Sequence, residues 1–379
     1  MYIIGHLLMD SHKIIMKRLL ILLFFPILAC YGQENTNVSP DLSDITISNF
    51  PIIDGSDSTE PLRLILMSKL LGFDYEWISS PFVQPEEAPN WVMPKYTGNS
   101  EEIRKLEESR LLNSNTHGSF LKLIDDKVEL IITARSISRD EKVYAEEKSV
   151  TLIEKPIARD ALAFMVNKKN PIDSLSIKQI QGIYTGDIIN WSEVGGWDCE
   201  MHPYVRNRNS GSQEKFETMV MAGLAIKDFP IMYVGSTMTA PYHQLDRDST
   251  GIAYTPFYYF TYISGNISSK VIGVDGVAMT KENIENDTYP YTSNVYAAVR
   301  SDIDESSLAY RIFDFLTTEK GQSIVEESGY IPLTTIPTDI YAIKSKYPQN
   351  NAIYDLSGRR VANPRRGFYV QDGKKVAIK

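Results

Sequence analysis

The sequence has little cysteine and little histidine. Only 2 of its 379 residues are Cys and 5 are His. If Cys30 is lipidated or removed with the leader, Cys199 has no partner for an internal disulfide. The apolar core must then hold the fold together. His117, His202 and His243 lack the spacing of metal ligands, and no nucleophile elbow is present. We therefore expect no metal, no cofactor and no catalysis.

Basic residues are outnumbered by acidic ones. The chain has 39 Lys and Arg against 48 Asp and Glu, which gives a net charge of −9 and a pI near 5.2. A surface that binds nucleic acid normally shows as a basic stripe, so this balance argues against a nucleic-acid partner. A small anion would have to be attracted by a few local charges.

The apolar run near the amino end is too short to cross a bilayer. It comprises residues 19–29, after the basic pair Lys17 and Arg18, whereas a transmembrane helix needs about 20 apolar residues. This pattern is typical of a secretory leader. We expect the leader to end at residue 30 and translation to start at Met16, and residues 1–15 have no role that we can argue.

Two routes of leader cleavage are open. Residues 27–30, Ile-Leu-Ala-Cys, resemble a lipobox, in which Cys30 would be lipidated and become the first mature residue. Ordinary signal peptidase could instead cut after Gly32 and leave Gln33 first. We favour lipidation of Cys30, and either route places the chain in the cell envelope.

Apolar strands alternate with helices beyond a polar linker at residues 31–44. Expected strands include residues 45–53, 128–133, 150–153, 161–166 and 251–254, and expected helices include residues 62–71, 176–184, 214–221 and 306–316. This alternation predicts an α/β fold with mainly parallel sheets. The length of 379 residues predicts two lobes or domains.

Three turns rich in Ser, Thr and Gly each precede an expected helix. They are residues 56–59, 116–119 and 210–212. Ordinary helix capping explains each turn singly. Together, hydroxyls and free helix N–H groups at the carboxyl ends of strands are typical of a site for a tetrahedral oxyanion. Residues 206–212, Arg-Asn-Arg-Asn-Ser-Gly-Ser, add two guanidiniums that can grip oxygens in pairs.

An ordered series of motifs resembles the substrate-binding proteins of phosphate ABC transporters. It comprises the turn at residues 54–62, Ile-Ala-Arg-Asp-Ala-Leu-Ala-Phe-Met-Val-Asn at 157–167, Ile-Asn-Trp-Ser-Glu-Val-Gly-Gly at 189–196, Gly-Ile-Ala-Tyr at 251–254 and Val-Asp-Gly-Val at 274–277. The resemblance covers residues 45–347. It implies a two-lobed type II periplasmic-binding fold, with a ligand cleft between the lobes and two hinge crossings.

The resemblance also implies where the lobes lie. Lobe 1 would be residues 45–155 plus 293–347, lobe 2 would be residues 156–292, and the chain would cross at 156–160 and 290–294. The tail, residues 348–379, lies outside the resemblance. It is β-like and resembles part of a type IX secretion sorting module.

Residue by residue, the resemblance assigns an oxyanion site. The matching residues are Ser58, Thr59, Thr116, Arg135, Arg206, Ser210, Gly211 and Ser212. Many phosphate-specific relatives carry an Asp after the strand that corresponds to residues 128–133, where it accepts the proton of hydrogen phosphate. Arg135 stands there and cannot accept, so this position does not separate phosphate from sulfate.

The implied function is capture of phosphate, or of a similar oxyanion, for delivery to an inner-membrane ABC permease. The protein would act as a monomer in the periplasm or at the cell surface, held to the membrane through Cys30 if it is lipidated. The alternative is an envelope interaction or sensing protein that keeps the fold without transport; the 22 tyrosines and the tail would suit it.

Overall fold

The computed structural model describes residues 39–79, 90–95, 100–264 and 268–333, together with the backbone of short strands between residues 353 and 378. The expected leader, Cys30 and most of the linker lie outside the described residues. Within the described part of the chain, no helix has both the length and the apolar character needed to cross a membrane.

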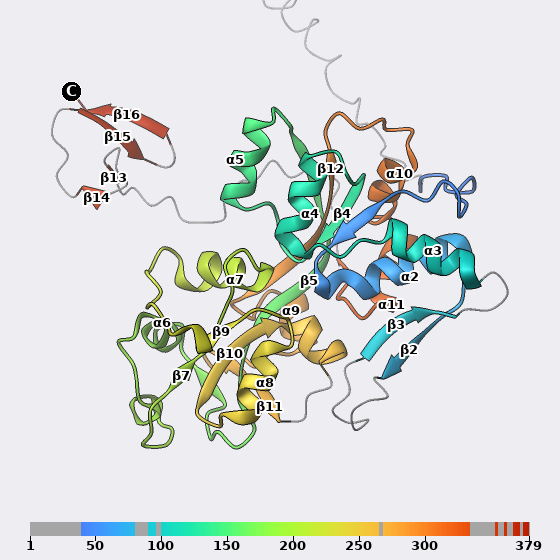
Figure 1. The fold of residues 1–379 in the computed structure, drawn as a ribbon. Coiled ribbons are helices and arrows are strands. Elements are labelled where there is room, and N and C mark those ends of the chain that lie inside the picture. Colours follow the sequence, from blue (N-terminus) through green and yellow to red (C-terminus); the bar gives the residue numbers. More distant parts are fainter. Residues whose placement is uncertain are drawn as a thin grey trace, which may run out of the picture. The chain divides into compact units, whose positions relative to one another are not determined.

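Strands and helices alternate along the body of the chain (Figure 1). Its strands are β1 (Ile53–Gly55), β2 (Tyr75–Ser79), β3 (Asn90–Pro94), β4 (Leu130–Thr133), β5 (Leu152–Asn167), β6 (Ser174–Leu175), β7 (His202–Pro203), β8 (Val205–Arg206), β9 (Val234–Gly235), β10 (Gly251–Pro256), β11 (Ser269–Val274) and β12 (Thr292–Arg300).

The α-helices are α2 (Glu60–Leu71), α3 (Ser100–Arg110), α4 (Asn115–Ile124), α5 (Arg139–Glu147), α6 (Ile177–Thr185), α7 (Gly211–Lys215), α8 (Ala240–Arg247), α9 (Lys281–Glu285), α10 (Leu308–Phe315) and α11 (Glu319–Glu327). Short 3-10 or π-helical turns are η1 (Asp57–Thr59), η2 (Trp191–Val194), η3 (Phe216–Met221), η4 (Ile231–Tyr233) and η5 (Tyr259–Ile263). The predicted α/β class is confirmed.

The main sheet is mixed, so the prediction of mainly parallel sheets was wrong. Its strand order is β1-β4-β12-β5-β10-β7, with β11 also paired to β5 and β6 paired to β11. The central pairs of β12 with β4 and β5, and of β10 and β11 with β5, are all antiparallel. Parallel pairing is confined to flanking pairs such as β1 with β4. The reason is that two long strands, β5 and β12, run past each other in opposite directions.

Strand β5 unites two segments that we predicted as separate strands. It is 16 residues long. Its first part pairs with β12 as far as Ala161, and its last part, from Leu162 onward, pairs with β10 and β11. Opposite Pro156 the ladder shifts register between Val295 and Tyr296. A bulge there fits Pro156, which has no N–H to donate.

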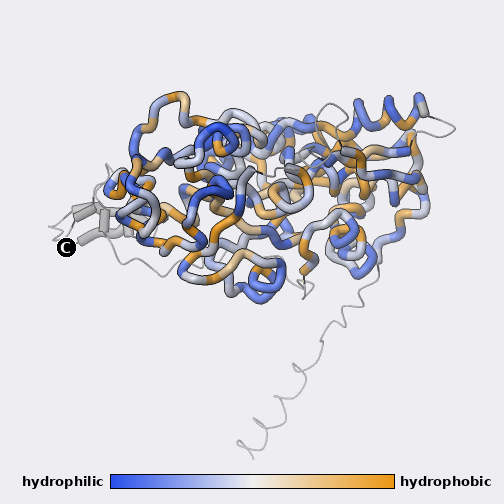
Figure 2. The backbone as a smooth tube through the Cα atoms, turned by 90° about the horizontal axis from the view of Figure 1, so that it is seen from below, coloured by the Kyte–Doolittle hydropathy of each residue, from blue (hydrophilic) through white to orange (hydrophobic). Residues whose placement is uncertain are grey.

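Apolar side chains cover both faces of the part of the main sheet formed by β1, β4 and β12. Successive side chains of a strand point to opposite faces. One face packs on α4 through Phe120, Leu123, Ile131 and Ala298. The other packs toward α2 and α10 through Leu130, Ile132, Ala297, Val299, Ile312 and Phe313. Figure 2 shows hydrophobic and hydrophilic stretches interspersed along the backbone of the body of the chain.

An aromatic cluster fills the core beside the far end of β5. Phe164 of β5 meets Tyr184, Phe216 and Tyr254 edge-on or tilted, and Tyr254 stacks on Phe216 with 4.4 Å between ring centroids. The Tyr254 hydroxyl accepts a hydrogen bond from the Arg206 backbone N–H at 3.0 Å. The core thereby fixes the end of β8.

The predicted β-rich tail contains four strands: β13 (Ile353–Tyr354), β14 (Arg360–Val361), β15 (Gly367–Gln371) and β16 (Lys374–Ile378). They form an antiparallel sheet of their own in the order β14-β13-β15-β16.

A buried ion pair joins α7 to β5. Lys215 Nζ lies 3.8 Å from Asp160 Oδ2, and both side chains are buried. Neither atom has a hydrogen-bond partner among the described residues. Burial raises the pKa of Asp160 and lowers that of Lys215, and the charge of each partner opposes the shift of the other.

Removing one partner of this pair should be far worse than removing both. We expect Lys215→Met to cost about 3–5 kcal/mol, because it leaves the Asp160 carboxylate buried without a counter-charge. The double variant Asp160→Asn/Lys215→Met should recover most of that loss. Urea denaturation of the wild type and the two variants measures this, and equal stability of the single and double variants would contradict it.

Candidate functional site

A pocket of about 390 Å³ lies beyond the carboxyl ends of β1, β4 and β8. We call it the polar pocket. It is lined by Ser56, Asp57, Ser58, Asn113, Asn115, Thr116, His117, Ala134, Arg206, Asn207, Arg208, Asn209, Ser210, Gly211, Ser212, Ser236, Met238 and Pro256. Hydroxyls, amides and guanidiniums dominate this lining, as the three predicted turns require. Its position agrees with the rule that open α/β sheets bind ligands beyond their strand ends.

The first wall of the polar pocket is held by a pair of hydroxyls. Ser56 Oγ and Thr116 Oγ1 are 2.7 Å apart, and Ser56 Oγ also accepts a hydrogen bond from the Ala134 N–H at 2.9 Å. These bonds join the ends of β1 and β4 to the start of α4. Three segments that are distant in sequence thus form one rigid surface.

Buried charges support this wall from beneath. The guanidinium of Arg63 in α2 donates to the Ser56 carbonyl at 3.2 Å, to Asn113 Oδ1 at 3.3 Å and to the Leu112 carbonyl. Asp54 Oδ1 accepts from the Ser114 N–H at 2.9 Å. Burial lowers the pKa of Arg63, and Glu60, Asp54 and Asp57 oppose that shift. Arg63 therefore links the turn at Ser56 to the segment at Leu112 and Asn113.

Arg206 dominates the second wall. Its side chain is buried, Nε donates to the Gly235 carbonyl at 3.1 Å, and Nη1 contacts the Met238 Sδ at 3.2 Å. Sulfur is a weak acceptor, and Nη2 has no hydrogen-bond partner among the described residues. Burial lowers the pKa of Arg206, which Tyr254 and Asp57 oppose, but a guanidinium stays protonated in proteins. The Arg206 guanidinium is thus fixed in position through Nε, and its Nη2 can still donate hydrogen bonds at the edge of the pocket.

The turn that follows brings the two walls into contact. Asn209 has a φ of 66°, a conformation that Asn accommodates better than most residues. Ser210 Oγ accepts the Gln213 N–H at 3.1 Å and caps α7. A Cβ added at Gly211 would lie 2.7 Å from Thr116 Oγ1, so the walls meet where only glycine fits. Ser212 Oγ is buried and has no partner among the described residues.

Six of the eight predicted ligand residues line the polar pocket: Ser58, Thr116, Arg206, Ser210, Gly211 and Ser212. The structure does not bring Thr59 and Arg135 into the lining. Thr59 Oγ1 instead donates to the Ser56 and Ile132 carbonyls, at 2.9 Å and 2.7 Å. It is a structural support for the turn, and direct contact of either residue with a ligand gains no support from the structure.

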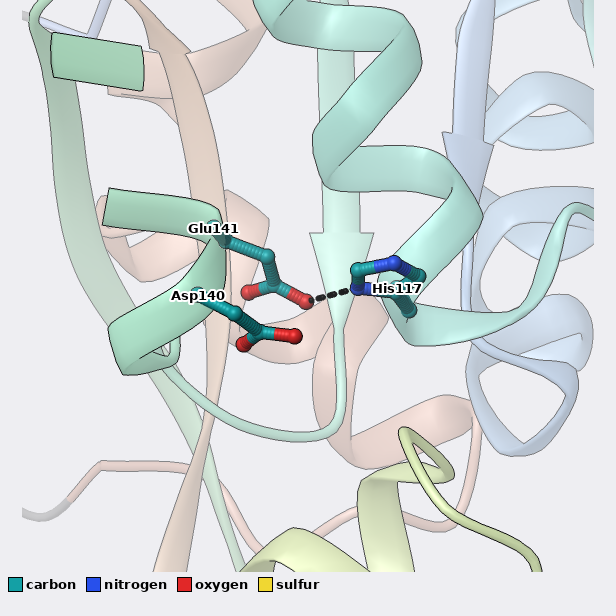
Figure 3. Close-up of side chains that lie close together, drawn as sticks. All are labelled: His117, Asp140 and Glu141. Carbon is teal, nitrogen blue, oxygen red and sulfur yellow. Dashed lines mark hydrogen bonds and ion pairs between the residues drawn. The ribbon is translucent and has the colours of Figure 1, made fainter. Parts of the chain in front are cut away.

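The guanidinium of Arg135 is occupied by Glu141. Nη1 and Nη2 each donate to one Glu141 carboxylate oxygen at 2.8 Å, and both side chains are buried. His117 Nδ1, from the pocket wall, shares a hydrogen bond of 3.0 Å with Glu141 Oε1, as Figure 3 shows. The arginine that we assigned to the ligand is therefore neutralised within its own wall.

His117, Asp140 and Glu141 hold metal-ligating atoms within 4.8 Å of one another. Both oxygens of Glu141 are already hydrogen-bonded, to Arg135 and to the Ser138 N–H. A cation would have to displace these donors and sit beside the arginine's positive charge. The arrangement is that of a charge network rather than a metal centre.

Sequence reasoning missed several lining residues. Arg208, which we took to be solvated, borders the polar pocket, and so does Asp57, which lies between Ser56 and Ser58. Asp57 could have been noticed as a carboxylate inside a turn of donors. Ser56 was counted in the turn but not selected, because its bond to Thr116 is a tertiary contact.

A second hollow, of about 760 Å³, lies between residues 45–48 and α3. Its lining mixes apolar side chains such as Leu71 and Phe73 with Glu102 and Lys105. It contains none of the predicted ligand residues, so the polar pocket remains the candidate site.

Comparison with known proteins places the chain in a family. The model of the PBP superfamily domain matches residues 92–319, which is more than half of the chain. The chain belongs to the PBP superfamily. The polar pocket draws on residues both inside this match and before it, from Ser56 to Ser58.

Curated relatives and a solved structure resemble this PBP superfamily member. Protein SphX of Synechococcus elongatus is 24% identical over 237 residues, 58% of this chain and 67% of the relative. Phosphate-binding protein PstS of Borreliella burgdorferi is 22% identical over 211 residues, 55% of this chain and 73% of the relative. A phosphate-bound structure of a putative phosphate ABC transporter substrate-binding protein from Clostridium perfringens has a TM-score of 0.51 at 22% identity, covering 75% of this chain and 99% of that one. The shared architecture confirms the predicted type II fold.

Breaking the Arg135–Glu141 pair should destabilise the protein. We expect Arg135→Gln to cost about 3–5 kcal/mol of unfolding free energy, because the Glu141 carboxylate would stay buried without its partner. The matched control Arg139→Gln alters an exposed arginine at the start of α5 and should cost less than about 0.5 kcal/mol. Chemical denaturation compares the two, and similar losses for both would contradict the pairing.

Proposed function

We propose that this PBP superfamily member captures inorganic phosphate in the polar pocket and delivers it to the permease of an ABC transporter. The observation that carries the proposal is the convergence of donors from two walls on one pocket. Ser58 and Thr116 border it from the first wall, and Arg206, Ser210, Gly211 and Ser212 border it from the second. Relatives named as phosphate-binding proteins support phosphate as the anion.

The chemistry of the pocket suits a tetrahedral oxyanion. Such an ion gives up much of its hydration on binding and needs several fixed donors at once. Ser212 Oγ and Arg206 Nη2 have no partner among the described residues, so they are available to a ligand. Hydrogen bonds to a charged group contribute about 1.5–3 kcal/mol each. Rigid donors lose little entropy when the anion binds.

The proposed working cycle uses the two lobes that we assigned from the sequence, residues 45–155 plus 293–347 and residues 156–292. Strands β5 and β12 pass between these segments, which makes them the candidates for the hinge. Separation of the walls would admit phosphate, and closure would place the Ser210–Ser212 turn against Thr116. The short distance between Gly211 and Thr116 supports this arrangement of the walls.

The proposed location is the cell envelope, with lipidation at Cys30 holding a monomer at the membrane surface. Cys30 lies outside the described residues, so this part rests on the leader pattern. An anchored binding protein would stay close to a membrane permease, which raises its effective concentration there.

Phosphate should bind with an affinity that depends on Arg206. Calorimetry of the chain without its expected leader, titrated with phosphate, sulfate, arsenate and molybdate, measures this. We expect phosphate to bind and Arg206→Ala to weaken it by at least about 100-fold, because two charge-assisted hydrogen bonds are lost. Arg208→Ala should weaken it less, since that side chain is exposed.

Arg104→Ala provides the matched control. Arg104 lies on α3, pairs with Glu101 and Glu108, and is half exposed. Its removal should change phosphate affinity by less than about twofold, because interactions between exposed, distant charges are screened by salt. No heat with any of the four anions, or an unchanged affinity in Arg206→Ala, would contradict the proposed function.

A further inference from the structure

Tyr330 is a buried tyrosine that reaches the first wall of the polar pocket from behind. It follows α11, is only 2% exposed and does not line the pocket. Its hydroxyl donates to the Ser58 carbonyl at 2.8 Å, across a separation of 272 residues in the sequence. A residue from near the end of the described body thus holds the turn η1 at the edge of the pocket.

Ser58 is the pocket residue whose direction depends most on this contact. It lines the polar pocket and is itself 2% exposed. Its hydroxyl makes no hydrogen bond with another described residue, whereas the hydroxyl of the adjacent Thr59 donates to two backbone carbonyls. A hydroxyl serves an anion only when its oxygen lies at hydrogen-bond distance and in a suitable direction. The backbone of η1 sets that position for Ser58.

A second buried tyrosine fixes the ring of Tyr330. The ring stacks on Tyr258 with 3.7 Å between the centroids and 9° between the planes. Tyr258 is also 2% exposed, and its hydroxyl donates to the Ser328 carbonyl at 2.8 Å. A ring packed in a close-packed interior has little freedom to change its rotamer. The Tyr330 hydroxyl is therefore directed at Ser58 by the packing around it.

The backbone on both sides of Tyr330 is held as well. The Ser328 carbonyl accepts from Tyr258 on one side, and on the other the Ile331 carbonyl accepts from the Arg159 N–H at 2.7 Å. Between them, Gly329 has a φ of 94°, which lets the chain turn sharply after α11. Tyr330 is thus placed by three backbone or ring contacts before its hydroxyl meets η1.

Tyr258 also connects this arrangement with the second wall. Its backbone N–H donates to Asp160 Oδ1 at 3.0 Å. Asp160 pairs with Lys215, the last residue of α7, and α7 begins at Gly211 in the second wall. The contacts from η1 through the two stacked tyrosines to α7 therefore link both walls behind the pocket.

The Tyr330 hydroxyl keeps its proton near neutral pH. Burial raises the pKa of Tyr330 above its ordinary value, and the charges of Asp160 and Tyr258 raise it further. A backbone carbonyl only accepts hydrogen bonds, so it needs a protonated phenol as its donor. The bond to Ser58 is therefore present under the conditions in which phosphate binding would be measured.

We propose that Tyr330 is a positioning residue of the polar pocket: it holds the Ser58 carbonyl so that the Ser58 hydroxyl points at the bound anion. The stack on Tyr258 keeps this turn in register with the second wall. This proposal rests on the proposed function, because it concerns how the same pocket holds phosphate. Tyr330 itself does not touch the ligand.

The test is a double-mutant cycle of Tyr330→Phe and Ser58→Ala, with phosphate affinity measured by calorimetry. Phenylalanine keeps the ring and its stack and removes only the hydroxyl. We expect Tyr330→Phe to weaken phosphate binding by about 5-fold when Ser58 is present, which is within the range of one neutral hydrogen bond. In the Ser58→Ala background the same change should weaken binding by less than about 2-fold, because the hydroxyl that Tyr330 positions is gone.

Tyr289→Phe is the matched control. Tyr289 is buried, its hydroxyl donates to the Leu162 carbonyl at 3.1 Å, and it does not line the pocket. It therefore loses a hydrogen bond of the same kind as Tyr330→Phe does. Both variants should lose similar stability in urea, but Tyr289→Phe should change phosphate affinity by less than about 2-fold. This comparison separates positioning of the pocket from a general loss of stability.

The outcomes separate this inference from the proposed function. Phosphate binding by the wild type that Tyr330→Phe leaves unchanged, or weakens equally with and without the Ser58 hydroxyl, would overturn the role of Tyr330 alone. Failure of the wild type to bind phosphate would overturn the proposed function and this inference with it. Thermal melting checks that each variant is folded. If Tyr330→Phe is not, Tyr258→Leu, which removes the stacked ring and leaves the Tyr330 hydroxyl, enters the same cycle with the same expected dependence on Ser58.

Discussion

The antiparallel ladder between β5 and β12 is the interaction on which the rest of the structure depends. It continues from Leu152 to Ala161 of β5, and the same strand then pairs with β10 and β11. One uninterrupted backbone thus carries both parts of the main sheet. The strand ends that border the polar pocket, those of β1, β4 and β8, are positioned by their place relative to this ladder and by the clusters packed on it. A shift in the ladder would move the walls apart.

Hydrogen bonds within the protein hold the first wall of the polar pocket in place. Arg63 and Asp54 are buried charges that spend their hydrogen bonds on the backbone of the first wall. The Tyr330 hydroxyl donates to the Ser58 carbonyl at 2.8 Å, and the Tyr330 ring stacks on Tyr258. These supports fix the loops without offering charge to the pocket itself. Among the groups that border the pocket, Ser212 Oγ and Arg206 Nη2 have no partner among the described residues.

Local patterns in the sequence were enough to find both walls, because a helix cap is encoded within a few residues. It was harder to predict which residue within a turn faces the pocket. Ser58 faces the pocket while Thr59 bonds to Ile132, and this difference of one residue depends on where β4 lies. Arg135 follows β4, but its side chain pairs with Glu141 on the following helix, and no local pattern in the sequence indicated that contact. The continuity of β5 was hidden by Pro156 and its charged neighbours, which read as a break.

The contact between Gly211 and Thr116 has a mechanical consequence. A single carbon atom added at Gly211 would lie 2.7 Å from the threonine hydroxyl, well inside the ordinary separation of nonbonded atoms. In the proposed working cycle, the lack of a side chain at Gly211 would let the two walls approach this closely. We expect a larger residue at this position to keep the two walls farther apart, with the donors still present but more exposed to water. On the proposed function, a residue without a side chain would thus be as important for enclosing the anion as the residues that donate hydrogen bonds to it.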